Sequence, residues 1–175
     1  IDAVLELRQR DGVEADRVEK IEVEIFQAAY DIIGGGGEGA KTEIRTKEQA
    51  DHSLPYLLAA ALLDGEVQPE QYTPDRIASD DVQRLLRRVE VAPADDLTER
   101  FPKELPVRVT IRLDDGTEHA ASRDDYEGFF TRPMSWDAAR AKFDRLAEPH
   151  ATLELRERIA TCIAELDERP IGELA

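Results

Sequence analysis

The residues 20–27 alternate between apolar and charged side chains in the way that a half-buried β-strand requires. Ile21, Val23 and Ile25 fall on one side of the segment, and Glu22 and Glu24 fall on the other. The pattern predicts a strand with one face on a hydrophobic core and the other face in water.

Residues 106–113 show the same alternation, with apolar residues at every second position from Val107 to Leu113 and with Arg108 and Arg112 between them. The turn sequence Asp114-Asp115-Gly116 then predicts a hairpin into a further strand at residues 118–123. The outward arginines would complement the outward glutamates of residues 20–27, so we expect the two strands to be neighbours.

The segment 54–64 predicts a helix with clear signals at both ends. Ser53 is a natural N-cap, Pro55 is tolerated in the first turn, and Gly65 ends the helix. Apolar residues surround almost the whole circumference of this segment, so we expect the helix to be buried.

The remaining periodicity predicts helices at 1–10, 80–88, 135–146 and 152–167, and a short strand at 89–92. In the third of these helices Trp136, Ala139, Phe143 and Leu146 form the expected buried face, and Ser135 the expected cap. The fold class that follows is α+β, a small and mostly antiparallel sheet covered by helices. No repeat or linker divides the chain, so we expect residues 1–175 to form one domain.

Length and composition set further bounds. No apolar run is long enough to cross a bilayer, and the first residues do not have the pattern of a signal peptide. The chain begins without Met, so we expect Ile1 to be a truncation or processing point. The single cysteine, Cys162, excludes an intrachain disulfide and fits a cytoplasmic location. Its helical neighbours Ile159, Ile163 and Leu166 predict that it is a small buried hydrophobe.

The charge balance is strongly acidic, with 39 Asp and Glu against 23 Lys and Arg and a net charge of −16. Such a surface repels nucleic-acid phosphate, so we expect no nucleic-acid partner, and we expect no membrane partner either. The acidic residues are scattered along the chain, which is typical of proteins from salt-loving organisms.

Two patterns look functional and fail on inspection. The loop GGGGEGAKT at 34–42 nearly matches a phosphate-binding loop, but Ala40 stands between the last glycine and Lys41, so the lysine is displaced. We interpret it as a surface loop. The three histidines, at positions 52, 119 and 150, have no metal-ligand spacing, so we expect no metal.

The stretch QADHSLPY at 49–56 is the best candidate site. A helix N-terminus presents unpaired N–H groups and a partial positive charge, which attract carboxylates and phosphates. His52 can carry a proton near neutral pH, and Tyr56 offers a hydroxyl one turn into the helix. The alternative is purely structural: Ser53 only caps, Tyr56 only packs, and His52 only binds a loop.

The string TKEQADHSLPYLLAAALLDGEVQPEQYTPDRI at 46–77 resembles the segment that marks the MmgE/PrpD family, which includes 2-methylcitrate dehydratases of propionate metabolism. Three further stretches are similar to that family in the same order: DDVQRLLRRVEV (80–91), VRVTIRLDDGTEH (107–119) and DYEGFFTRPMSWDAARAKFDRL (125–146). The resemblance covers about residues 1–165.

The resemblance implies the smaller, α+β domain of a two-domain protein whose all-helical domain is missing here. It also implies cofactor-free chemistry on small di- or tricarboxylic acids in a cleft between the domains, and a possible homodimer of the parent. By resemblance, Tyr56 and His52 are the catalytic candidates, and Ser53 and Asp51 the substrate-binding candidates. We expect Tyr56 to donate or relay a proton, and His52 to help hold a carboxylate.

Three functions stay open at this point. The parent is a 2-methylcitrate dehydratase-like hydro-lyase, a decarboxylase or epimerase of the same family acting on cis-aconitate or iminodisuccinate, or a non-catalytic binding module that keeps the fold. In each case we expect the isolated fragment to be nearly inactive, because further histidines and lysines of the family come from the missing domain.

Overall fold

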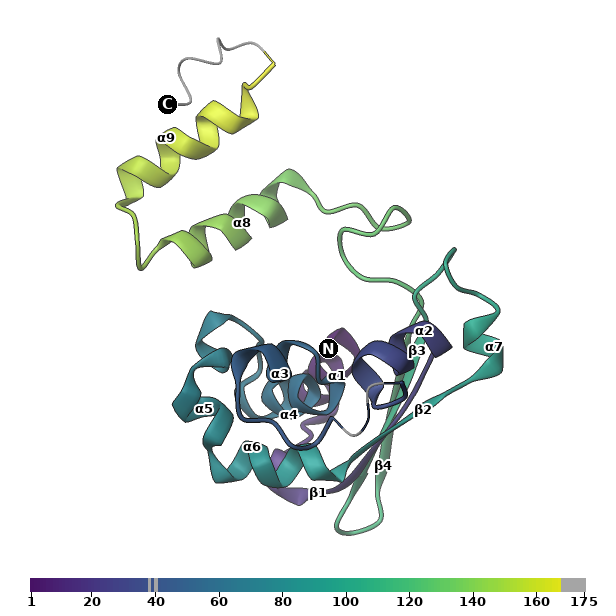
Figure 1. Ribbon diagram of the computed structural model, residues 1–175. Helices are drawn as coiled ribbons and strands as arrows, with labels where there is room; N and C mark the ends of the chain where they lie inside the picture. The colour runs from purple at the N-terminus through teal and green to yellow at the C-terminus, as the bar shows by residue number, and fades with distance from the viewer. Residues whose placement is uncertain (38, 40, 168–175) are drawn as a thin grey trace. The chain divides into compact units, whose positions relative to one another are not determined.

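The computed structural model describes residues 1–37, 39 and 41–167 (Figure 1). The chain divides into two compact units, one of residues 1–126 and a second that begins at Glu127. The helices and strands, with 3₁₀ and π turns labelled η, are α1 (Asp2–Asp11), η1 (Ala15–Arg17), β1 (Val18–Ile25), α2 (Gln27–Ala29), η2 (Tyr30–Gly34), α3 (Lys47–Asp51), α4 (Leu54–Asp64), η3 (Pro69–Tyr72), α5 (Pro74–Ala78), α6 (Asp80–Leu85), η4 (Leu86–Arg88), β2 (Val89–Pro93), α7 (Asp95–Thr98), β3 (Val107–Leu113), β4 (Glu118–Arg123), α8 (Trp136–Ala147) and α9 (Leu153–Ala164).

The four strands of the first unit form one sheet in the order β2-β1-β3-β4. β1 pairs with β2 in parallel and with β3 antiparallel, and β3 and β4 form the predicted hairpin. The turn uses Gly116, whose φ of 83° is in the left-handed region that suits glycine. The prediction of an α+β fold with a mostly antiparallel sheet is confirmed.

The expected pairing of outward charges is confirmed for one arginine and differs for the other. Glu24 lies opposite Arg108 in the register, and the Arg108 Nε donates to a Glu24 carboxylate oxygen at 2.8 Å. Arg112 lies opposite Lys20 and instead binds Glu19 at 2.9 Å. A register irregularity between Val18 and Lys20 shifts Glu19 into reach, and the alternation of the sequence does not reveal such an irregularity.

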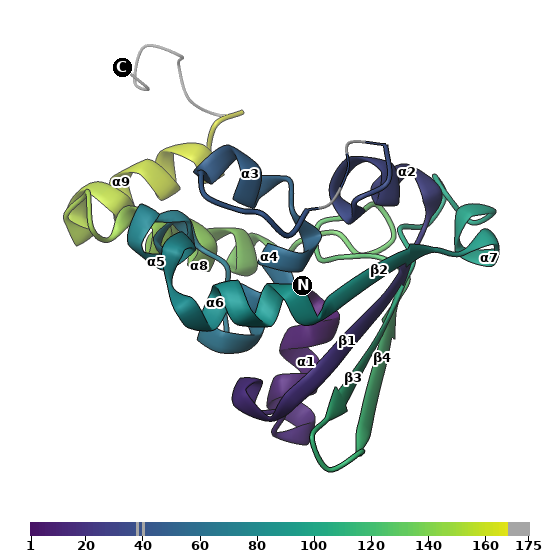
Figure 2. The same cartoon turned by 60° about the horizontal axis from the view of Figure 1, so that its bottom comes forward.

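Helices α1 and α4 cover one face of the sheet, and Figure 2 shows them on the same side of the four strands. The predicted bounds of α4 are correct, and Ser53 and Gly65 are its caps. Seven side chains from Leu54 to Leu62 are buried, together with Pro55. The inward residues of β1 and β3 complete this core, so α4 is the central helix of the first unit.

The second unit contains α8 and α9. The Ser135 side chain caps the N-terminus of α8, and the Thr152 side chain caps the N-terminus of α9. The expected buried face of α8 is wrong: Trp136 is 52 % exposed, Leu146 is also exposed, and Ala139 and Phe143 are only half-buried. Two short helices offer each other too little area to bury a whole apolar stripe. Cys162 is half-buried for the same reason, not buried as expected.

Candidate functional site

The predicted site lies where the short helix α3 ends and α4 begins. Thr46 caps α3 in a reciprocal capping box with Gln49, so the backbone before His52 is fixed by local hydrogen bonds. His52 ends α3 and Ser53 caps α4, so the two helices meet with no intervening loop. This tight junction carries three of the four residues singled out from the sequence, and Tyr56 follows in the first turn of α4.

Ser53 is completely buried, and its hydroxyl has two partners. The Oγ accepts a hydrogen bond from the Tyr56 backbone N–H at 3.1 Å and donates to the Lys41 carbonyl oxygen at 2.6 Å. The capping role is therefore present in the structure, and the second bond ties the end of the glycine-rich loop to α4. The hydroxyl of Ser53 therefore uses both its donor and its acceptor within the protein, and it holds the first turn of α4 against the segment at Lys41.

Tyr56 is also completely buried, and its hydroxyl donates to the Gln71 carbonyl oxygen. Burial raises the pKa of Tyr56 to about 12, because the phenolate loses its hydration and the nearby Asp64 and Tyr72 also disfavour a negative charge. The Arg76 charge acts in the opposite direction. Tyr56 is thus un-ionised near neutral pH, and its only hydroxyl proton is donated inside the domain.

Gln71, whose backbone carbonyl oxygen accepts this hydrogen bond, belongs to a chain of polar contacts that the sequence did not predict. Its side-chain amide donates to Asp64 at 3.1 Å, and the Arg76 guanidinium binds Asp64 through Nη2 at 2.6 Å and Nε at 2.9 Å. Arg76 also binds Asp81 at 2.9 Å. These residues lie on four different elements and match no short motif, so sequence spacing gave no signal that they meet.

His52 and Asp51 lie nearer the surface. The His52 Nδ1 is 3.1 Å from the Glu48 carbonyl oxygen, which can only accept, so Nδ1 carries a proton and a neutral ring keeps Nε2 as its acceptor. Asp51 binds the Lys47 ammonium at 2.5 Å, and this ammonium lies 5.5 Å from the centre of the Tyr72 ring. The exposed wall of the site is therefore a histidine beside a lysine, a carboxylate and an aromatic ring.

The first turn of α4 also borders a groove of about 340 Å³ in the first unit, with Leu54 and Leu57 among its walls. Its other walls are mostly apolar, and its charged members are Asp2, Asp125 and Arg123. Arg123 already pairs with Glu6. A groove of this composition does not by itself offer the surplus of cations that a polycarboxylate requires.

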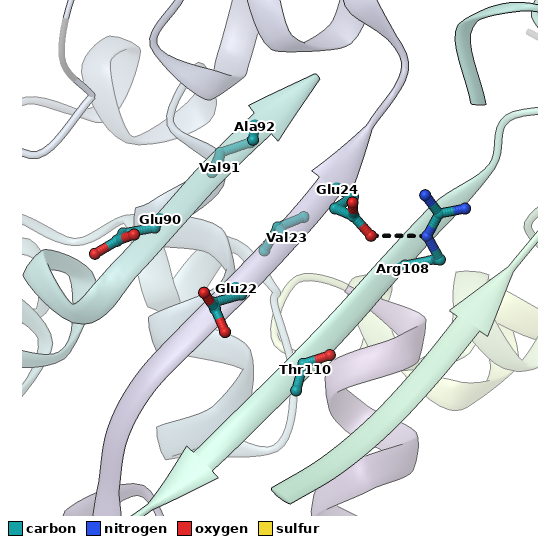
Figure 3. A pocket seen from close by; sticks show the side chains of 8 residues that line it. All are labelled: Glu22, Val23, Glu24, Glu90, Val91, Ala92, Arg108 and Thr110. Carbon is teal, nitrogen blue, oxygen red and sulfur yellow. Dashed lines mark hydrogen bonds and ion pairs between the residues drawn. The ribbon is translucent and has the colours of Figure 1, made fainter. Parts of the chain in front are cut away.

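A second groove, of about 400 Å³, lies on the sheet face opposite α1 and α4, and Figure 3 shows its lining residues on β2, β1 and β3. Glu24 meets Arg108 there, and Arg108 also binds Asp96 at 2.6 Å. Lys20 bridges Glu22 and Glu90, at 2.8 Å from each. Four carboxylates, of Glu22, Glu24, Glu90 and Asp96, thus share the two cations of Lys20 and Arg108, so the groove is a solvated surface with an excess of negative charge.

The two patterns that the sequence analysis set aside can be located only in the part of the chain that the structure describes. Helix α3 begins only at Lys47, well after the phosphate-loop-like segment, two of whose residues, 38 and 40, lie outside the described part. No group of three or more His, Cys, Asp or Glu side chains within that part could hold a metal ion. No described helix is long and apolar enough to cross a membrane.

Comparison with known families gives a match to the model of the MmgE/PrpD C-terminal domain over residues 1–168. The chain belongs to the MmgE/PrpD family. The match spans both compact units, so this MmgE/PrpD domain includes α8 and α9 as well as the sheet. Whether residues 1–175 act as a single domain of a longer protein stays a prediction.

Among curated proteins, this MmgE/PrpD domain is similar to the cis-aconitate decarboxylases of Mus musculus and Homo sapiens. The identities are 26 % and 24 %, each over 123 residues, or 70 % of this chain. The chain spans about a quarter of the length of these relatives, since the matched part is 25 % of each. The comparison therefore concerns one part of a longer protein architecture.

Proposed function

We propose that this domain belongs to a lyase for small di- or tricarboxylic acids and forms one wall of its active site. The family match over residues 1–168 carries the proposal, and the enzyme names of the relatives support it. The acidic first unit, with no surplus of cations in either groove described above, supports a site completed by a helical domain of the parent.

The reaction we propose first is the dehydration of 2-methylcitrate. The base removes a proton next to a carboxylate, an acid protonates the departing hydroxyl, and cations hold the charge that develops. Decarboxylation of cis-aconitate is the second candidate, because both relatives above carry that name. In both reactions negative charge develops on the substrate next to a carboxylate in the transition state. The same active-site wall could therefore take part in either reaction.

Within this wall, His52 is the side chain best placed to reach a ligand. Its neutral ring accepts a proton at Nε2, and its protonated ring binds a carboxylate. Asp51 acts by holding Lys47, and Ser53 by holding the first turn of α4. For Tyr56 we propose a proton relay, in which the hydroxyl passes a proton only when its bond to the Gln71 carbonyl is exchanged for one to the substrate.

The test is turnover by the full-length parent in high salt with 2-methylcitrate, cis-aconitate and iminodisuccinate side by side. We expect loss of water from 2-methylcitrate, with kcat lowered on the order of tenfold or more in both His52→Asn and Tyr56→Phe. Loss of CO₂ from cis-aconitate would replace the first candidate with the second. No turnover of any of the three acids would refute these three substrates and leave a different acid or a non-catalytic binding module as the candidates.

A further inference from the structure

The polar chain behind Tyr56 begins at the Gln71 backbone carbonyl, and the side chains of this chain come from the neighbouring segment 64–81. Gln71 is 7 % exposed and lies in the turn η3. Its side-chain oxygen accepts from the Gln68 N–H at 2.9 Å, and its amide donates to Asp64 at 3.1 Å. Both ends of the Gln71 side chain are engaged, so its backbone carbonyl is held at a fixed distance from α4.

Asp64 is held in turn by a planar fork. The Nε and Nη2 of Arg76 donate to the two carboxylate oxygens of Asp64, which is the bidentate geometry that lysine cannot reproduce. The remaining nitrogen, Nη1, binds Asp81 and Ser79 at the start of α6. Arg76 therefore connects the end of α4 to the start of α6 through one partly buried side chain.

From this arrangement we propose that Asp64, Gln71 and Arg76 are positioning residues for Tyr56. Arg76 orients Asp64, Asp64 orients Gln71, and the Gln71 carbonyl sets where the Tyr56 hydroxyl lies. The proposal rests on the function proposed above, in which this hydroxyl relays a proton. A buried tyrosine that serves only packing needs one hydrogen-bond acceptor for its hydroxyl. Here the residue that supplies the acceptor, Gln71, is itself held by an ionic network that joins α4, α5 and α6.

The first part of the test concerns the hydroxyl alone and uses the 175-residue chain. A buried hydroxyl bonded to a carbonyl exchanges its proton slowly, so we expect a proton NMR signal that disappears in Tyr56→Phe. Asp64→Asn and Arg76→Lys should shift or broaden this signal, since each keeps the side-chain size and removes the fork. Arg108→Lys is the matched control, because Arg108 also bridges two carboxylates, Glu24 and Asp96, but on the outer sheet face.

The second part uses the full-length parent. We expect kcat to fall on the order of tenfold in Asp64→Asn and Arg76→Lys, with KM changed much less and with no change in Arg108→Lys. The pH dependence of kcat should change in the same two variants and stay unchanged in Arg108→Lys. Far-UV circular dichroism confirms the fold of each variant, and if Asp64→Asn does not fold, Arg76→Lys alone carries the test.

The outcomes separate the two proposals. An unshifted hydroxyl signal in both variants overturns the positioning network, whatever the parent does. A shifted signal with normal kcat, while Tyr56→Phe is slow, also overturns it and leaves the proposed function standing. Normal kcat in Tyr56→Phe overturns the relay and the positioning role together. A shifted signal together with a lower kcat supports both.

Discussion

The Ser53 hydroxyl lies 2.6 Å from the carbonyl oxygen of Lys41 and donates to it, while the same oxygen caps α4. One buried side chain therefore fixes both the first turn of the central helix and the end of the loop that precedes α3. Because this buried hydroxyl makes both hydrogen bonds, removing it should destabilise the fold more than removing an ordinary exposed helix cap.

Replacing Ser53 with alanine should lower the free energy of unfolding by about 1–3 kcal/mol, since the cap is lost and the Lys41 carbonyl loses its donor. The measurement is urea unfolding followed by circular dichroism. Thr46→Ala is the control, because Thr46 caps the exposed helix α3 and its hydroxyl bonds only Gln49 in the described structure. Equal losses in the two variants would argue against the second role of Ser53.

In the 175-residue chain, Tyr56→Phe should also lower stability, by about 1–3 kcal/mol, because the buried Gln71 carbonyl is left without its donor. The ring itself still fills the core. Tyr30→Phe is the comparison, since the Tyr30 side chain is only half-buried. A Tyr56→Phe chain as stable as the wild type would show that the bond contributes nothing net.

The raised pKa of Tyr56 predicts how stability depends on alkaline pH. Burial raises this pKa to about 12 in the folded chain, against about 10 in an unfolded one. Above about pH 10 the unfolded tyrosine ionises while the folded one does not, so this contribution to stability is lost as the pH rises towards 12. The stability difference between wild type and Tyr56→Phe should therefore shrink between about pH 10 and 12, as urea midpoints would show. A constant difference would contradict the raised pKa.

Molar KCl should raise the melting temperature of the chain, because the net charge of −16 is self-repulsive and salt screens it. Salt also weakens exposed ion pairs such as Arg108 with Glu24, but each of these contributes only about 0–1 kcal/mol. The effect of Arg108→Gln on the melting temperature should accordingly become smaller in KCl. A melting temperature that is flat or falls with salt would refute the inference of a salt-adapted protein.

Purified residues 1–175 should show no measurable turnover of any of the three acids. Neither groove described in the first unit carries unpaired cations in surplus, so the carboxylates and the developing charge would have too few partners. Initial rates at high enzyme concentration are the measurement. Turnover above that of a heat-denatured sample would show that the site is complete within this chain.

The sequence predicted the elements whose pattern is long and regular. The alternation in β1 and β3 reflects a real inward face, and the bounds of α4 follow from Ser53, Pro55 and Gly65. Helices α2, α3, α5 and α7 were not predicted, because helices of three to five residues are too short to show a helical period. The face of α8 was misjudged because periodicity indicates which residues share a side, not whether anything covers that side.

The candidate site was located by sequence only in part. The capping role of Ser53 follows from local rules at a helix start. The hydrogen-bond partner of Tyr56 cannot be predicted from such rules. It is the backbone carbonyl of Gln71, fifteen residues away, and every residue type carries a backbone carbonyl. Interactions of that kind depend on how the chain folds back, which local pattern does not encode.

The parallel pairing of β1 with β2 has a consequence for synthesis of the protein. Between these neighbours the chain must make every element from α2 to η4, and the antiparallel partner β3 comes later still. β1 is therefore complete on the ribosome long before either neighbour exists, with both edges and its apolar side unpaired. Lys20, Glu22 and Glu24 alternate with that apolar side, and charges at these positions oppose pairing with other nascent chains. Glu22 and Glu24, which lie on the exposed face of the finished sheet, therefore also disfavour aggregation of β1 before β2 and β3 have been synthesised.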